Sequence, residues 1–373
     1  MMKMESAMAE SLYVHVPFCT SICFYCDFAH VVYQKNLVQQ WLHALSAQLS
    51  HMKINRQLKT IYVGGGTPGC LHDDELAALL QMLDPYCHEV QEYTVECNPE
   101  SLTLEKAALL AKHGVNRVSL GMQSADDRLL ASIGRHHTFA DTCRAVSLLK
   151  QADIHNISLD LMYSLPHQTM KDLQDSIARA IALEPTHLSL YSLTVEKNTV
   201  FGRKGIQPLD DDTEADMYEY ICCELPRHGY RQYEISNFCL DGYESRHNLA
   251  YWHYDDFYGV SCGASGKEGL LRYDNEKNLM RYLQNPMARN EIHLDRQDAQ
   301  FEMIMMSLRL KKGLDLSAYQ HRFHHAYEED YGSKTEALIK RGWLEESDGY
   351  VRCSDQGYEI CNTVLEELMP KGE

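Results

Sequence analysis

The stretch LYVHVPFCTSICFYC (residues 12–26) joins a short β-branched run to three closely spaced cysteines. The run at 12–16 predicts a strand, and Cys19, Cys23 and Cys26 follow it with the spacing C-x3-C-x2-C. A structural zinc site takes four ligands and a disulfide takes two cysteines, so three thiols indicate a different kind of site. Iron–sulfur clusters are held by thiolates, and with three thiolates one iron of a cubane keeps an open coordination position.

Two other interpretations of the three cysteines stay open at the level of the residues. One is a zinc site with His15 or His30 as fourth ligand, and the other is a set of buried thiols without metal. The chain has 13 cysteines, an odd number, and most stand alone in apolar surroundings. This usage indicates a reducing compartment.

The bulk composition excludes several classes of protein. No secretory signal precedes residue 12 and no apolar run reaches the ~20 residues of a membrane span, so we expect a cytoplasmic protein without a transmembrane segment. The net charge is −18, from 53 acidic and 35 basic residues. Nucleic-acid binders carry a basic face, and because no stretch is dense in Lys or Arg we expect no nucleic-acid partner.

Strand-like runs recur beyond residues 12–16 and alternate with amphipathic segments, which predicts βα units around a parallel sheet. Six units are fewer than the eight of a closed barrel. We therefore expect an α/β fold, a partial (βα)6 barrel, with a doubly wound sheet as the alternative. The other strand runs are 60–63, 93–96, 117–121, 157–161 and 187–193, and the helical segments are 37–49, 73–83, 104–113, 139–152, 170–183 and 212–225.

The alternation ends near Tyr230. The following residues are rich in Tyr, Asn, Gly and Asp, which is typical of loops and short strands. Helical periodicity returns after Gln297, and a turn at 347–349 between short apolar runs predicts a small hairpin. Helices with a hairpin resemble a winged-helix module. We expect a barrel domain at 1–235, a connecting segment at 236–295 and a C-terminal helical, winged-helix-like domain at 296–373.

The cysteine spacing, with the aromatic Tyr25 before the last cysteine, resembles the signature of the radical S-adenosylmethionine (SAM) superfamily. The resemblance implies a partial (βα)6 barrel and a [4Fe-4S] cluster held by Cys19, Cys23 and Cys26. It also implies that the fourth iron binds the amine and carboxylate of SAM, whose sulfonium is cleaved after one-electron reduction by an external reductant. The protein then supplies ligation and positioning, and the cofactor supplies the chemistry.

Further motifs follow the predicted strands, at the edge where a barrel carries its active site. They are GGGTP (64–68), ECNPES (96–101) and LGMQS (120–124). Alone, each residue in them could be a turn, a cap or an ion pair. The resemblance implies that a SAM pocket is lined by Tyr13, Tyr25, Gly65, Gly66, Thr67, Glu96, Gln123, Arg135, Asp160 and Thr194. Carboxylates suit ribose hydroxyls, and an arginine suits the methionine carboxylate.

Over nearly its whole length the chain resembles one subgroup of this superfamily, the heme chaperones, which are grouped with oxygen-independent coproporphyrinogen III oxidases. The oxidases have a fourth cysteine two residues after the third, where this chain has Phe28. They also carry a longer segment before the first strand, whereas Tyr13 lies near the start here. Both departures favour a heme chaperone that delivers heme to acceptor hemoproteins.

The stretch SRHNLAYW (245–252) matches the HNxxYW motif of these chaperones. A neutral imidazole is a good axial ligand for heme iron, so the resemblance makes His247 the candidate heme ligand. Cys239 and His253 are nearby alternatives, and a purely structural role for His247 is the competing interpretation. Ser265 stands where relatives often have a histidine.

Three functions follow for testing. The first is a heme chaperone that keeps cluster and SAM and touches membranes only through its acceptors. The second is an oxygen-independent coproporphyrinogen III oxidase that decarboxylates its substrate to protoporphyrinogen IX. The third is a radical enzyme acting on a substrate other than a porphyrin. The sequence leaves open whether the chain is an enzyme, because productive cleavage of SAM cannot be derived from these residues.

Overall fold

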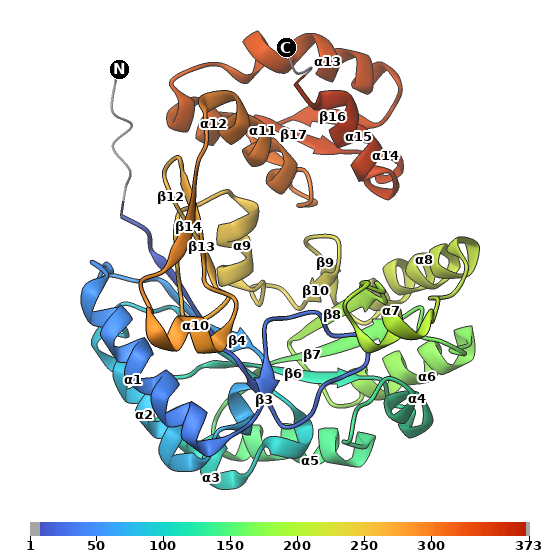
Figure 1. Cartoon of the computed structure of the whole chain (residues 1–373). Coiled ribbons are helices and arrows are strands. Elements are labelled where there is room, and N and C mark those ends of the chain that lie inside the picture. Colours follow the sequence, from blue (N-terminus) through green and yellow to red (C-terminus); the bar gives the residue numbers. More distant parts are fainter. Residues whose placement is uncertain (1–7, 371–373) are drawn as a thin grey trace.

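The computed structural model describes residues 8–370, so the first seven and last three positions of the predicted domains lie outside it (Figure 1). Its centre is a twelve-stranded sheet in the order β14-β13-β12-β11-β1-β4-β5-β6-β7-β8-β10-β9. The middle strands from β1 to β8 pair in parallel, which confirms the predicted six βα units of a partial barrel. These strands are β1 (Ser11–Val16), β4 (Thr60–Gly65), β5 (Glu92–Cys97), β6 (Arg117–Gln123), β7 (Asn156–Tyr163) and β8 (His187–Ser192).

Helices cover the outer face of the parallel strands (Figure 1). Each predicted helical segment is present, because apolar residues at helical spacing pack on the sheet and polar residues close the ends. The side chains of Thr138 and Thr169 cap α5 and α6, each with an aspartate three residues on that returns the hydrogen bond. The helices are α1 (Lys35–His51), α2 (Asp73–Leu83), α3 (Leu104–Lys112), α4 (Asp127–Ser132), α5 (Phe139–Gln151), α6 (Met170–Ile181), α7 (Val200–Lys204) and α8 (Asp211–Arg227).

Residues 231–295 extend this sheet at both edges. On one side β10 (Asn237–Cys239) pairs antiparallel with β8, and β9 (Arg231–Gln232) pairs with β10. On the other side β11 (Phe257–Val260) pairs in parallel with β1, so β1 becomes an interior strand. The antiparallel β12 (Ser265–Glu268), β13 (Leu271–Asn275) and β14 (Arg289–His293) follow β11, and α9 (Arg246–Trp252) and α10 (Leu279–Gln284) lie between strands.

The C-terminal residues form a helical domain with its own apolar core and a three-stranded sheet. The predicted hairpin is present as β16 (Leu344–Ser347) and β17 (Tyr350–Cys353), closed by Asp348 and Gly349 with positive φ angles of 54° and 78°. The remaining elements are α11 (Arg296–Ser307), β15 (Leu314–Asp315), α12 (Leu316–Phe323), α13 (Tyr327–Lys340), α14 (Asp355–Glu359) and α15 (Cys361–Leu368). No helix among residues 8–370 has both the length and the apolar character needed to cross a membrane.

Candidate functional site at the carboxyl ends of the strands

The cysteine loop follows the carboxyl end of β1. Its two ends pair with each other, because β2 (Phe18–Cys19) lies parallel to β3 (Val31–Val32). The backbone N–H of Phe24 donates to the Ile133 carbonyl at 3.0 Å, which ties the middle of the loop to the barrel. Cys19, Cys23 and Cys26 are all free thiols of intermediate exposure. The structure therefore holds three thiols on one fixed loop.

The three thiols are partly buried. The Sγ of Cys19 is 3.7 Å from Thr67 Oγ1, and the Sγ of Cys26 is 3.8 Å from His30 Nδ1. Burial raises the pKa of Cys19 to about 12 and that of Cys26 to about 11. A positive centre is needed to keep such thiols ionised near neutral pH.

The donor set fits the two kinds of metal site expected from the sequence to different degrees. In residues 8–370 no three Cys, His, Asp or Glu side chains converge on one point as a single metal ion requires. A cubane makes no such demand, because each thiolate binds a different iron. His15, one of the proposed zinc ligands, has Nδ1 2.9 Å from Tyr13 Oη and Nε2 2.8 Å from the Ala29 carbonyl. The thiol set is compatible with a cluster, and His15 is already engaged within the chain.

The glycine turn at the end of β4 supports the cysteine loop. A Cβ at Gly66 would lie 2.4 Å from the Phe18 carbonyl oxygen, so only glycine allows the loop backbone to pack there. The backbone N–H of Gly66 donates to the Val16 carbonyl at 2.8 Å, and that of Thr67 donates to Phe18 at 2.7 Å. In this structure the glycine turn allows close approach of the chain's own cysteine loop.

Two carboxylates project into the barrel from β5 and β7. Glu96 accepts hydrogen bonds from Tyr62 Oη at 2.6 Å and from the N–H of Gly65 at 3.0 Å. Asp160 accepts from Ser119 Oγ, at 3.0 and 2.9 Å to its two oxygens. Burial raises the pKa of Glu96 to about 7 and raises that of Asp160. Both predicted residues therefore lie inside the barrel with partners from neighbouring strands.

A second set of polar side chains lies close to Gly121 on β6. Arg135 donates from Nε to Tyr25 Oη at 3.2 Å and from Nη1 to Asn98 Oδ1 at 2.7 Å. A Cβ at Gly121 would lie 2.9 Å from Gln123 Nε2 and 3.1 Å from Arg135 Nη2, so these side chains meet there. Tyr25, Gln123 and Arg135 were predicted together, and the structure brings them together. Thr194 is exposed in the loop after β8.

Asn98 and Tyr62 belong to these groups and were missed by the sequence analysis. Asn98 lies one residue beyond β5, in the motif ECNPES, and its place after a strand end was the available signal. Tyr62 lies on β4 and gave no signal, because an aromatic residue in a strand is typical of a core position. Its hydroxyl matters here because it donates to Glu96.

A large cavity of about 1220 Å³ lies between the barrel, β11–β13 and the C-terminal domain. Its apolar walls come from α9, β11, the 234–237 segment and α11, and Phe28 of the cysteine loop borders it with 64% of its surface exposed. The indole N–H of Trp252 is buried without an acceptor in the described residues. The lining includes Tyr13, His15, Phe28, Tyr191, Glu234, Ile235, Asn248, Tyr251, Trp252, Tyr254, Phe257, Lys267, Arg272, Lys277, Glu302, Met305, Met306 and Arg309.

Charged residues fix the C-terminal domain across this cavity. Lys267 Nζ lies 2.6 Å from Asp256 Oδ1 and 4.0 Å from the centroid of the Tyr254 ring. Tyr254 Oη donates to Glu302 on α11 at 2.7 Å, and Arg272 Nη1 lies 2.8 Å from the same carboxylate. Because these pairs join β12 and β13 to α11, they hold one wall of the cavity in place.

The predicted heme ligand His247 does not face this cavity. It is fully buried, with Nδ1 2.8 Å from Thr60 Oγ1 and Nε2 2.8 Å from Tyr251 Oη. Its ring stacks on Tyr62 at 5.2 Å between centroids, and burial lowers its pKa to about 3. Both ring nitrogens are engaged, so this conformation offers no lone pair to an iron outside.

The start of α9 explains the position of His247. The carboxylate of Glu92 accepts from the backbone N–H groups of Arg246 at 2.8 Å and His247 at 3.0 Å. A carboxylate at a helix N-terminus satisfies free N–H groups and suits the helix dipole. Thr60 and Glu92 are the first residues of β4 and β5. His247 therefore lies at the amino ends of the strands, opposite the cysteine loop, and the HNxxYW motif anchors α9 inside the barrel.

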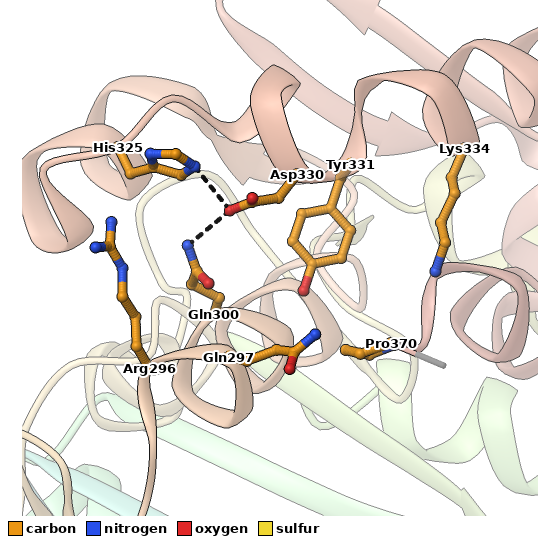
Figure 2. A pocket seen from close by; sticks show the side chains of 8 residues that line it. All are labelled: Arg296, Gln297, Gln300, His325, Asp330, Tyr331, Lys334 and Pro370. Atoms are coloured by element: carbon orange, nitrogen blue, oxygen red, sulfur yellow. Dashed lines mark hydrogen bonds and ion pairs between the residues drawn. The ribbon is translucent and has the colours of Figure 1, made fainter. Parts of the chain in front are cut away.

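A second cavity, of about 580 Å³, lies within the C-terminal domain (Figure 2). His325 Nε2 lies 3.0 Å from Asp330 Oδ2, and Gln300 Nε2 donates to the same oxygen at 3.0 Å. Arg296 donates to the Phe323 carbonyl at 2.6 Å, and Lys334 donates to Met369 at 2.7 Å. Because these groups already pair within the chain, we assign no ligand to this cavity.

Comparisons with known proteins agree with the geometry. Residues 13–180 match the family model of the radical SAM superfamily, and residues 294–360 match the HemN C-terminal domain. A solved structure titled as coproporphyrinogen III oxidase (HemN) of Escherichia coli, a radical SAM enzyme, has a TM-score of 0.83 and covers 97% of this chain and 90% of its own. Its sequence identity is 19%, so this likeness concerns the fold.

Curated relatives are closer in sequence. The proteins named heme chaperone HemW from Lactococcus lactis and Bacillus subtilis are 37% and 35% identical, and cover 96% and 95% of this chain and 97% and 98% of their own. The HemW of Escherichia coli is 32% identical over 95% of this chain and 97% of its own. With a radical SAM barrel, a HemN-type C-terminal domain and full-length relatives of this kind, the chain belongs to the HemW family of the radical SAM superfamily.

Proposed function

We propose that this protein is a heme chaperone, which binds heme and passes it to acceptor hemoproteins. The observation that carries the proposal is the 1220 Å³ cavity between barrel and C-terminal domain, whose walls include aromatic, methionine and cationic side chains. A porphyrin needs a flat apolar cleft for its ring and cations for its carboxylates. Full-length relatives that are named heme chaperones support the same conclusion.

We further propose that Cys19, Cys23 and Cys26 hold a [4Fe-4S] cluster beside a SAM site. The three thiols share one loop, and the loop is fixed to the glycine turn and to Ile133. When bound and reduced, such a cluster supplies one electron for cleavage of the SAM sulfonium. The chain's part is to ligate, to orient and to exclude water.

The proposed SAM site uses both polar groups at the carboxyl ends of the strands. Arg135, already held by Tyr25 and Asn98, offers a guanidinium to the methionine carboxylate. Gln123 adds an amide beside it. Glu96 and Asp160 lie deeper in the barrel, where carboxylates accept hydrogen bonds from ribose hydroxyls. Tyr13, Gly65, Gly66, Thr67 and Thr194 complete the proposed set.

Phe28 connects the two proposed sites. It lies two residues after Cys26, so the cluster loop and the heme cavity share one short segment of chain, of roughly 7 Å at most. Its exposed ring borders the cavity. A ligand against Phe28 would therefore lie close to the cluster, and loading of one site should be sensed at the other.

The test is anaerobic reconstitution followed by two parallel assays. Titration with heme should give a saturable Soret band at one heme per chain, and Trp252→Ala should weaken binding about tenfold, because one wall of the cavity loses its ring. Lys204→Ala, a change on α7 outside the cavity lining, is the control. Wild-type protein that gives no saturable band would overturn the proposal.

The second assay addresses the oxidase alternative. The E. coli oxidase shares the fold over 97% of this chain, but at 19% identity that likeness says nothing of activity, so the assay has to decide. Formation of protoporphyrinogen IX from coproporphyrinogen III, with SAM and a reductant, would establish the alternative. We expect none, because Phe28 stands where the oxidases have a fourth cysteine.

A further inference from the structure

Helix α11 presents one stripe of side chains to the large cavity. Glu302, Met305, Met306 and Arg309 all line it, at the i, i+3, i+4 and i+7 spacing of one helix face. The stripe continues past Ser307, where α11 ends, because the N–H of Arg309 still donates to the Met306 carbonyl at 3.2 Å. The alternate face, with Met303 and Ile304, is buried in the core of the C-terminal domain. Two thioethers therefore border the cavity from a well-packed helix.

The nitrogen ligands near the cavity are already occupied. His247 is buried with hydrogen bonds at both ring nitrogens. His15 borders the cavity, but Tyr13 and the Ala29 carbonyl occupy its two nitrogens, and the residue is 4% exposed. His253 and Cys239, the remaining alternatives, are not among the residues that line the cavity. An iron in this cavity would find no free imidazole in the described chain.

We propose that the Met305–Met306 pair supplies an axial thioether ligand to the heme iron. This inference rests on the proposed heme binding and adds the residue that holds the metal. Methionine is an established type of haem ligand, and its neutral sulfur carries no proton and breaks no hydrogen bond when it binds. Both methionines are partly buried, since they pack against the apolar core of the C-terminal domain and also line the cavity.

Arg309 offers a second contact to the bound heme. It lies one turn beyond the methionines and borders the cavity, and its guanidinium makes no ion pair or side-chain hydrogen bond within residues 8–370. One helical turn is about 5 Å, so a side chain there reaches the edge of a ring whose centre is held by methionine. The guanidinium is placed to take a heme carboxylate.

The choice of ligand has a redox consequence. Thioether ligation raises the reduction potential of haem relative to nitrogen or oxygen ligands. Heme in this cavity should therefore favour the ferrous form. Loss of the sulfur should lower the reduction potential of the heme and change the spin state of its iron. Substitution of a histidine outside the cavity should change neither.

The experiment compares spectra of the heme-loaded full-length protein with those of Met305→Leu, Met306→Leu and the double variant. Wild-type ferric protein should show the near-infrared charge-transfer band of a thioether–iron bond. The double variant should lose that band and have a lower midpoint potential. Leucine keeps volume and apolarity, so the fold should persist, which far-UV circular dichroism checks. Met280→Leu, on α10 and 53% exposed, is the matched control.

The outcomes separate this inference from the proposed function. Wild-type protein that binds no heme would overturn both. Wild-type protein that binds heme without the thioether band, or a double variant that keeps wild-type band and potential, would overturn the methionine ligand alone. His247→Gln should keep the band, and its loss together with an intact fold would return the ligand role to His247.

Discussion

The two ends of the barrel both carry polar residues, but these residues are bonded differently. At the amino end, His247, Glu92 and Thr60 are buried and bonded to one another. At the carboxyl end, three thiols, Arg135 and Gln123 gather where loops meet, and the cysteines remain free. A buried polar group that is satisfied within the chain stabilises the fold, whereas thiols without a disulfide partner beside a guanidinium can serve a ligand. A polar residue type by itself therefore does not say whether the residue serves the fold or a ligand.

The largest effect is expected at the cysteine loop. Cys23→Ser should abolish the reconstituted cluster, from about four irons per chain to less than one, because cubane ligation needs thiolates. Iron and sulfide analysis with EPR spectroscopy measures this. Cys143→Ser, a change on α5, serves as control. A Cys23→Ser protein with a full complement of iron would show that the carboxyl end is not built as we propose.

His247→Ala should chiefly destabilise the fold. The substitution removes two buried hydrogen bonds and a stacked ring and leaves the Tyr251 hydroxyl without its partner, at a cost of about 2–4 kcal/mol in unfolding free energy. Urea denaturation measures the cost. His253→Ala, an exposed neighbour after α9, should change it by less than about 0.5 kcal/mol. Equal stability of both variants would contradict the structural role of the amino end.

Arg135→Leu should weaken SAM binding by about tenfold in reconstituted protein, because one charge-assisted contact is lost. Isothermal titration calorimetry gives the dissociation constant. Arg144→Leu, on the exposed face of α5, is the matched control for removal of an arginine. An unchanged affinity in Arg135→Leu would move the methionine carboxylate away from this polar group.

The smallest effect concerns pH. Burial raises the folded-state pKa of Glu96 to about 7, above its ordinary value of 4.5. A raised pKa means that folding favours the protonated form, so the contribution of Glu96 to stability is complete below pH 4.5 and declines as the pH rises through 7. Because Glu234 titrates in the same range, the comparison should be made against Glu96→Gln. The variant should show a flatter profile of unfolding free energy between pH 5 and about 8, and identical profiles would show that Glu96 is not protonated on folding.

Local patterns predicted the parallel core of the fold because its causes are local. Apolar periodicity placed the helices, and capping threonines such as Thr138 mark where they begin. Likewise, the turn at Asp348 and Gly349 is visible in the sequence as a hairpin signal. The cysteine loop was predictable for the same reason, since its three thiols lie within eight residues.

Contacts between residues far apart in the sequence could not be predicted, because no local pattern indicates the partner. The imidazole of His247 binds Thr60, 187 positions away, and its backbone binds Glu92, 155 positions away. A motif with a histidine beside aromatic residues is equally typical of a ligand site and of a buried anchor. The cavity itself needs α9, β11–β13 and α11 in place before it exists. Its volume and its methionines could therefore be recognised only from the fold.

The interior position of β1 affects how the chain can be made. One edge of β1 pairs with β4, which follows within about fifty residues. The other edge stays unpaired until β11 has been synthesised, because Ser11 pairs with Phe257 and Val14 with Val260. On a ribosome that adds 5–20 residues per second, this edge stays open for roughly ten seconds or longer. An unpaired strand edge is prone to aggregate. The segment that carries the three proposed cluster cysteines therefore lies beside an exposed strand edge until residue 260 has been synthesised.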